Sequence, residues 1–193
     1  MLTNHDFSAS LRRALRGLIL AGLPLVAGCA STSYRPVSDT PVRIGKPYQV
    51  RGVTYVPAEN PAYDELGYAS WYGSESGNMT ANGERFRANG ISAAHRTLPL
   101  PTYVEVTALD SGRTILVRIN DRGPFARGRI IDLSKGAAAL LGVRTQGVAA
   151  VRVRRVEPPE RDRAKLRDGK SAIARANVPE ATLAMWRARL AQR

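Results

Sequence analysis

Asp121 is the residue that first raises a question of chemistry. It lies in the stretch ILVRINDRGPFARGRIIDLS, where Ile115, Val117 and Ile119 alternate with other residues, and continuing that alternation places Asp121 on the same face. A carboxylate on an apolar face is costly unless it is paired, hydrogen-bonded or used. Partial burial would raise the pKa of this carboxyl group toward the range of a general acid. The alternative is that Asp121 holds the following loop by accepting hydrogen bonds from backbone N–H groups.

Three further residues could take part in acid–base chemistry. Glu84 ends the turn-rich motif TANGE, which can direct a carboxylate into a cleft, although an exposed loop acid is the commoner fate of glutamate. His95 lies in AAHRTLPL and is either a site residue or a structural histidine with one satisfied nitrogen. Asp132, in IIDLS, is predicted to be structural. We expect it to be a buried partner of one of three arginines: Arg118, Arg122 or Arg129.

The elements that must position these residues are short strands separated by turn signals. Two alternating runs, 102–109 and 113–121, are joined by Asp-Ser-Gly and predict a hairpin. Residues 135–142 predict a short helix that is capped by Ser134 and closed by Gly142. Further strands are expected at 67–73, 127–134 and 147–156, and a small hairpin at 46–57 with its turn near Arg51-Gly52. Many short strands with one short helix predict a mainly β fold, a small closed barrel without free edges.

The first thirty residues resemble a bacterial lipoprotein signal. A positive segment precedes the apolar run GLILAGLPLVAG, which is too short to span a bilayer comfortably, and LVAGC places small residues before Cys29. We therefore predict a signal peptide at 1–28, acylation of Cys29, and a mature periplasmic protein anchored to the membrane through its acyl chains. Because Ala30 follows rather than an aspartate, the resemblance favours the outer membrane. An ordinary signal peptide with an incidental cysteine is the alternative.

The charge of the chain narrows the choice of partner. The 193 residues carry a formal net charge of +13, which implies an acidic or polyanionic neighbour. Nucleic acid does not fit, because aromatic residues make up only 6% of the chain and the sequence has no glycine-rich phosphate loop, zinc-type spacing or basic recognition helix. Anionic cell-wall polymer and anionic lipid remain as candidate partners.

The composition divides the chain into four parts. After the signal peptide, 29–66 is predicted to be a tether and pre-domain segment, and 67–156 has the composition of a folded domain. Two prolines end that domain, and 157–193 is a basic tail in which leucine and tryptophan recur at helical spacing from about Pro179 onward. The tail is either a surface helix that holds an anionic partner or a loosely ordered, solvated segment, and we expect the second.

Within the predicted domain, five motifs resemble the rare lipoprotein A family of septal-ring lytic transglycosylases. They are ASWYG, TANGE, AAHRTLPLPTYVEV, VRINDRGPFARGRIIDLS and AALLG, in the order expected for the family. The resemblance implies a six-stranded double-psi β-barrel and an endolytic enzyme that cleaves peptidoglycan glycan strands, preferably strands stripped of stem peptides. It also implies 1,6-anhydromuramic acid ends on the product, no metal or other cofactor, and cell-division proteins as partners.

The resemblance places Glu84, His95 and Asp121 around one groove as catalytic residues. Substrate contacts are assigned to residues of the same motifs: Trp71, Tyr72, Asn82 and Arg122. One departure concerns Arg87, because many members of the family carry an acidic residue at this position. Arg87 therefore supports a rival hypothesis, in which a catalytically silent barrel binds glycan or a division protein as a scaffold.

Overall fold

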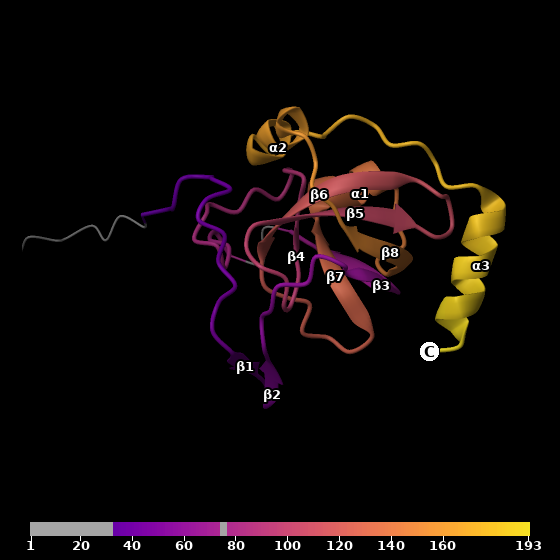
Figure 1. The fold of residues 1–193 in the computed structure, drawn as a ribbon, viewed down its shortest axis with the longest axis horizontal. Coiled ribbons are helices and arrows are strands. Elements are labelled where there is room, and N and C mark those ends of the chain that lie inside the picture. Colours follow the sequence, from indigo (N-terminus) through magenta and orange to yellow (C-terminus); the bar gives the residue numbers. More distant parts are fainter. Residues whose placement is uncertain (1–32, 74–76) are drawn as a thin grey trace, which may run out of the picture. The chain divides into compact units, whose positions relative to one another are not determined.

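The computed structural model describes residues 33–73 and 77–193. The predicted signal peptide and Cys29 lie outside the described residues. Within the described ranges, no helix is long and apolar enough to cross a membrane. Figure 1 shows that most strands gather into one barrel and that the last two helices lie on its outside.

Six strands form the barrel: β3 (Asp64–Tyr72), β4 (Ser92–Ala94), β5 (Thr102–Ala108), β6 (Thr114–Asp121), β7 (Arg129–Ser134) and β8 (Ala149–Arg155). They close in the order β3-β7-β4-β6-β5-β8. The pairs β3–β7 and β4–β6 are parallel, and the other neighbours are antiparallel. The predicted mainly β, closed, six-stranded barrel is therefore confirmed. Its first strand begins at Asp64, three residues before the predicted domain boundary.

Strand β4 was not expected from the sequence, although it is central to the sheet. It has only three residues, too few to show a period of two. It nevertheless pairs with β6 on one side and with β7 on the other. Because β4 pairs with both strands, it lies between the end of β6, which carries Asp121, and β7, which carries Asp132.

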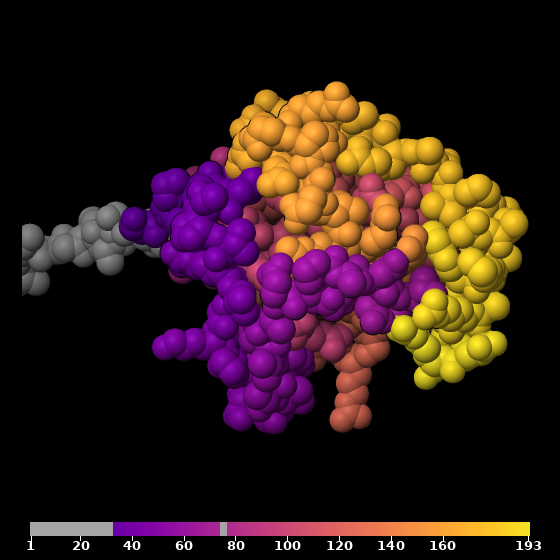
Figure 2. Space-filling model, in the orientation of Figure 1, coloured from indigo at the N-terminus to yellow at the C-terminus, as the bar shows by residue number. Residues whose placement is uncertain are grey.

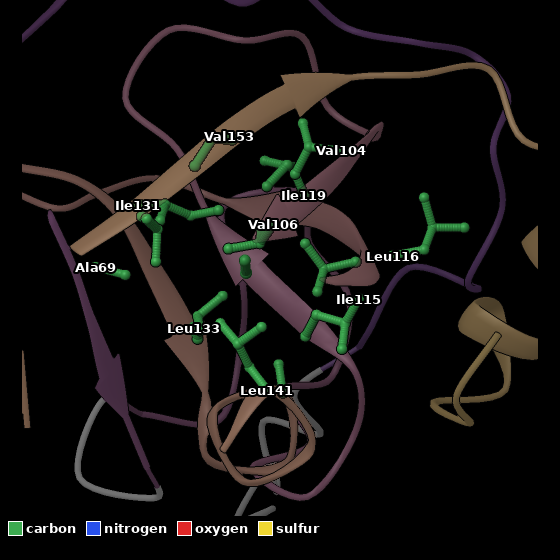
Figure 3. Packing of buried hydrophobic residues seen from close by; sticks show 14 of the residues in the cluster. Ala69, Val104, Val106, Ile115, Leu116, Ile119, Ile131, Leu133, Leu141 and Val153 are labelled. Carbon is green, nitrogen blue, oxygen red and sulfur yellow. The ribbon is translucent and has the colours of Figure 1, made fainter. Parts of the chain in front are cut away.

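Branched aliphatic side chains fill the interior of the barrel. Val104, Ile119, Ile131 and Val153 are fully buried and come from four different strands, and Figure 3 shows them converging. Leu141 of helix α1 (Lys135–Leu141) reaches the same cluster. Each such side chain contributes about 1.5–3 kcal/mol on burial, so this core is the main source of stability.

Helix α1 forms as the sequence predicts. The Ser134 side chain accepts a hydrogen bond from the backbone N–H of Ala137 at 3.1 Å, which caps the first turn. Gly142 ends the helix with φ +86°, a left-handed conformation that glycine adopts without strain. The predicted hairpin of β5 and β6 is also present.

The upstream hairpin is confirmed as well, with β1 (Tyr48–Val50) paired to β2 (Val53–Tyr55). Arg51 and Gly52 form its turn with φ of +50° and +79°. Positive φ at both central residues is the requirement of a type I′ turn, the turn that suits the twist of a two-residue hairpin.

An N-terminal segment, 33–45, lies along the barrel instead of forming only a tether. Arg35 donates to the Asn82 side-chain oxygen at 2.9 Å. Asp39 accepts hydrogen bonds from the Tyr103 hydroxyl at 2.8 Å and from Arg118 at 3.2 Å. The part of the predicted tether that the structure describes is thus fastened to the predicted domain by side-chain contacts.

The C-terminal segment differs from the expected loose, solvated tail. It forms α2 (Glu160–Arg167) and α3 (Glu180–Ala191), the second of which begins where the helical spacing predicts. Leu166 and Leu183 are 4% and 2% exposed and pack against barrel residues. The barrel residues that they contact are distant in the sequence. The composition of the tail alone therefore could not predict this packing.

We predict that Leu183→Ala lowers the free energy of unfolding by about 2 kcal/mol or more, because it removes a buried side chain from a cluster with Leu66 and Leu109. Met185→Ala on the same helix is the matched control, since Met185 is 60% exposed and should change stability by less than about 0.5 kcal/mol. Urea unfolding measures both. Equal stability of the two variants would contradict the packing of α3.

Candidate active site

A cavity of about 430 Å³ opens at the end of β6 and is lined by both Asp121 and Asp132. The two aspartates flank Ala94, which pairs with Asp121 on β6 and with Asp132 on β7. Since neighbouring strands lie about 4.8 Å apart, the two Cα atoms are separated by roughly 10 Å. Ala94 and Gly123 line the cavity together with the two aspartates.

The end of β6 is irregular at the residue before Asp121. Ala93 pairs with Ile119 but Ala94 pairs with Asp121, so Asn120 is an extra residue in β6. An irregularity of this kind bends a strand and redirects the side chains that follow it. The simple alternation predicted from the sequence is therefore interrupted just before the candidate acid.

Asp121 has both of the properties that the sequence left as alternatives: a raised pKa, and hydrogen bonds that hold the following loop. Its Oδ1 accepts hydrogen bonds from the backbone N–H groups of Ala81 and Arg122, each at 2.8 Å. Burial raises the pKa of the Asp121 carboxyl group above its ordinary value, and these two hydrogen bonds together with the Arg122 charge only partly offset that effect. The raised pKa is confirmed, and one oxygen holds the loop as well.

Asp132 is held in place by two neighbours. Its Oδ1 accepts a hydrogen bond from the Ser70 hydroxyl at 2.6 Å and lies 3.5 Å from Nε of Arg129. The predicted arginine partner is therefore confirmed, and it is Arg129. The sequence assigned only a structural role, because an acid in IIDLS gives no sign that β4 will bring it to the cavity of Asp121.

Glu84 does not line this cavity. It is 1% exposed, and its carboxylate accepts hydrogen bonds from Arg118 at 2.7 and 2.8 Å, from Asn82 at 2.8 Å and from Asn120 at 2.9 Å. It is therefore not the exposed loop acid considered as an alternative. The Glu84 carboxylate is therefore occupied by a buried ion pair and two asparagine side chains.

The His95 side chain lines a separate hollow in the surface, although the His95 backbone N–H donates to the carbonyl oxygen of Asp121 at 3.0 Å. Its Nδ1 accepts hydrogen bonds from the backbone N–H groups of Thr97 at 3.2 Å and Leu98 at 3.0 Å, which places the ring proton on Nε2. Burial, together with the charges of Arg96 and Arg122, lowers the pKa of His95 to about 3. The side chain matches the structural histidine with one satisfied nitrogen. The His95 ring and the Asp121 carboxyl group therefore line different hollows, although their backbones are in contact.

Tyr72 is the predicted substrate contact that the cavity supports best. It lines the cavity and stacks on Phe86, with ring centroids 4.9 Å apart. Its hydroxyl oxygen is buried without a hydrogen-bond partner in the part of the chain that the structure describes. Burial and the charges of Asp121 and Asp132 raise the pKa of Tyr72, so the hydroxyl keeps its proton.

The other three predicted substrate contacts are engaged elsewhere. Trp71 donates its indole N–H to the Arg144 carbonyl at 3.0 Å, and Asn82 is 2% exposed. Arg122 lines the cavity, but its guanidinium donates to the Leu98 carbonyl at 2.6 Å and to the Ile44 carbonyl at 3.0 Å. Their side chains support the loops around the cavity.

Arg87, the departure from the family pattern, also lies outside the cavity of Asp121. Its guanidinium donates to the Asp168 carbonyl at 3.3 Å, at the C-terminal end of α2. The arginine therefore fastens the C-terminal segment to the barrel and does not replace an acid beside Asp121.

The barrel region is similar in sequence to known proteins. The family described as lytic transglycolase matches residues 64–153, from β3 to β8. The endolytic peptidoglycan transglycosylase RlpA of Pseudomonas aeruginosa is 52% identical over 114 residues, which cover 58% of this chain and 33% of that protein. The protein of the same name from Vibrio cholerae is 41% identical over 169 residues, covering 77% and 64%. The barrel is similar in sequence to the rare lipoprotein A proteins.

The resemblance carried by the five motifs is thereby confirmed, together with the double-psi form of the six-stranded barrel. The chain spans from one third to about two thirds of the length of these relatives. The matched region contains all the residues around the cavity that come from the barrel, whereas the β1–β2 hairpin lies before it.

We predict that His95→Asn weakens the dependence of stability on pH. The folded-state pKa of about 3 lies below the unfolded value near 6.5, so protonation favours unfolding. This contribution is fully present above about pH 6.5 and is lost as the pH falls toward 3, by up to about 1.4 kcal/mol per pH unit. Asparagine keeps an acceptor oxygen near the position of Nδ1 and does not titrate. Urea unfolding of both proteins across this range measures the difference, and parallel pH curves would contradict the prediction.

Proposed function

We propose that this protein is an endolytic lytic transglycosylase that cleaves the glycan strands of peptidoglycan. The observation that carries the proposal is Asp121, a carboxyl group with a raised pKa in a cavity of the barrel. A general acid needs a raised pKa and a place where a substrate can reach it, and the raised pKa of Asp121 and its position in the cavity support this role. The names of the relatives, which describe endolytic peptidoglycan transglycosylases, support the same function.

The reaction proceeds without water as a reactant. Asp121 donates its proton to the glycosidic oxygen while the bond to the anomeric carbon of muramic acid breaks and positive charge develops on that sugar. The 6-hydroxyl of the same sugar attacks the anomeric carbon and passes its proton to the ionised Asp121, which restores the acid and leaves a 1,6-anhydro end. Asp132 provides a second carboxyl group in the cavity to stabilise the developing positive charge. Tyr72 forms part of the cavity wall against which the substrate packs.

The rival function is a scaffold that binds glycan without turnover. The support for this function was Arg87 in place of an acid. Because Arg87 contacts the end of α2, it does not change the surroundings of Asp121. A binder of neutral sugars gains nothing from a buried acid with a raised pKa, whereas a proton donor requires one. Asp121 and Asp132 in one cavity therefore favour the enzyme.

We predict that Asp121→Asn lowers the rate of anhydro-end formation by about 10²–10⁴-fold, the usual contribution of a positioned proton donor. Asparagine retains an oxygen that accepts from Ala81 and Arg122, so the loop and the melting temperature should hold. Substrate binding should change little, because the proton is needed in the transition state. Activity of the unsubstituted protein should fall as the pH rises through the raised pKa of Asp121, since only the protonated acid donates.

Mass spectrometry of glycan strands and thermal unfolding on the same preparation test this prediction. Asp110→Asn is the matched control, because Asp110 is exposed in the turn between β5 and β6 and does not line the cavity. Near-full activity of a stably folded Asp121→Asn protein would refute the acid role. New reducing ends from the unsubstituted protein would indicate a hydrolase, and no new ends would indicate the scaffold.

We also propose that Cys29 carries acyl chains and anchors the protein in the outer membrane, on the periplasmic side. The support is the sequence LVAGC, in which the chain's single cysteine follows small residues, and Ala30 after it. This location would place the barrel in the compartment that contains peptidoglycan.

Cys29→Ala should abolish acylation and release the protein from the membrane fraction. The barrel begins at Asp64, so the released protein should keep its activity on isolated glycan strands. Mass spectrometry of the N-terminus and cell fractionation are the measurements. Recovery of an acylated, membrane-bound Cys29→Ala protein would exclude the proposed anchor.

A further inference from the structure

The cavity of Asp121 is also lined by three arginines, and two of them are engaged. Arg122 donates to backbone carbonyl groups, and Arg129 lies beside Asp132. The third, Arg51, is exposed at the tip of the β1–β2 hairpin. Its guanidinium makes no hydrogen bond or ion pair with any residue of 33–73 or 77–193. A positive group without a partner at the wall of the cavity is available to an anionic ligand.

Arg51 is held at this wall by the packing of its hairpin. The ring centroid of Tyr55 lies 5.4 Å from that of Tyr48 and 5.6 Å from that of Phe125, which belongs to the loop after Asp121. The Tyr48 hydroxyl donates to the Arg96 carbonyl at 2.7 Å. Figure 2 shows the hairpin projecting beyond the barrel, so its outer surface is open to a long polymer.

A glycan strand without stem peptides offers one kind of anionic group to such an arginine. The sugars of a peptidoglycan strand are neutral apart from the lactyl side chain of muramic acid. That side chain ends in a free carboxylate when the stem peptide has been removed and in an amide when the peptide is present. A guanidinium binds a carboxylate through charge-assisted hydrogen bonds and has no comparable partner in an amide.

We propose that Arg51 forms an anion subsite that binds the free lactyl carboxylate of muramic acid, and so favours strands stripped of stem peptides. The proposal rests on the function proposed above and adds the residue that reads the substrate. The carboxylate of Asp132 repels the lactyl carboxylate, whereas Arg51 on the hairpin wall attracts it. The opposed charges therefore fix which way the muramic acid residue faces in the cavity.

Arg51→Gln tests the subsite. With strands stripped by an amidase, we expect KM to rise and binding to weaken by about two- to fivefold, the range of a solvent-exposed ion pair. The value of kcat should be unchanged, because the contact is the same in the ground state and the transition state. With strands that keep their stem peptides, both quantities should stay as in the unsubstituted protein. Arg51→Lys should restore part of the binding, since it keeps the charge but loses the planar fork.

Arg127→Gln is the matched control. Arg127 is also exposed and unpaired within the described ranges, and lies near the cavity, but it does not line it. The Arg127→Gln substitution removes the same charge and should change KM and binding for neither substrate. Equal losses on both substrates for Arg51→Gln, or no loss on either, would overturn the subsite. Co-sedimentation with the two kinds of strand reports binding without turnover, so an inactive unsubstituted protein would refute the enzyme and still leave the subsite open to test.

Discussion

A buried ion pair between Glu84 and Arg118 is the interaction on which the rest of the structure depends. The two side chains are 1% and 2% exposed. Burying two charges costs several kcal/mol per ion, and the cost is recovered only when the remaining hydrogen-bonding capacity is filled. Here Asn82 and Asn120 donate to Glu84, while Asp39 accepts from Arg118. Loss of one partner would leave the other as an uncompensated buried charge, at a cost of about 3–5 kcal/mol.

The ion pair positions the candidate acid without entering its cavity. Glu84 closes the turn in which Ala81 donates its backbone N–H to Asp121. Asn120, whose amide donates to Glu84, is the extra residue of β6 just before Asp121. A change at Glu84 would therefore lower activity by moving the acid, which makes Glu84 a positioning residue in this structure.

The same ion pair connects the barrel to segments outside the predicted domain. Asp39 of the N-terminal segment contacts both Arg118 and Arg167 of α2. The strands of 67–156 supply the interior of the barrel, while the flanking segments cover the outward-facing side of β6. Leu116 and Arg118 on that side are each 2% exposed, although an outward face of a barrel strand would otherwise meet solvent.

The sequence by itself determined what depends on near neighbours along the chain. Local patterns of a few adjacent residues predicted the Arg51-Gly52 turn, the cap of Ser134 and the β5–β6 hairpin. Short motifs likewise predicted the family resemblance. The raised pKa of Asp121 could also be predicted, because the strand pattern alone indicates that its carboxyl group is partly buried. Only the tertiary structure decided which acids meet. Three-residue β4 brings Asp132 to the cavity of Asp121, while the buried ion pair with Arg118 holds the Glu84 side chain away from it. These contacts join residues too far apart in sequence for any periodicity to reveal them.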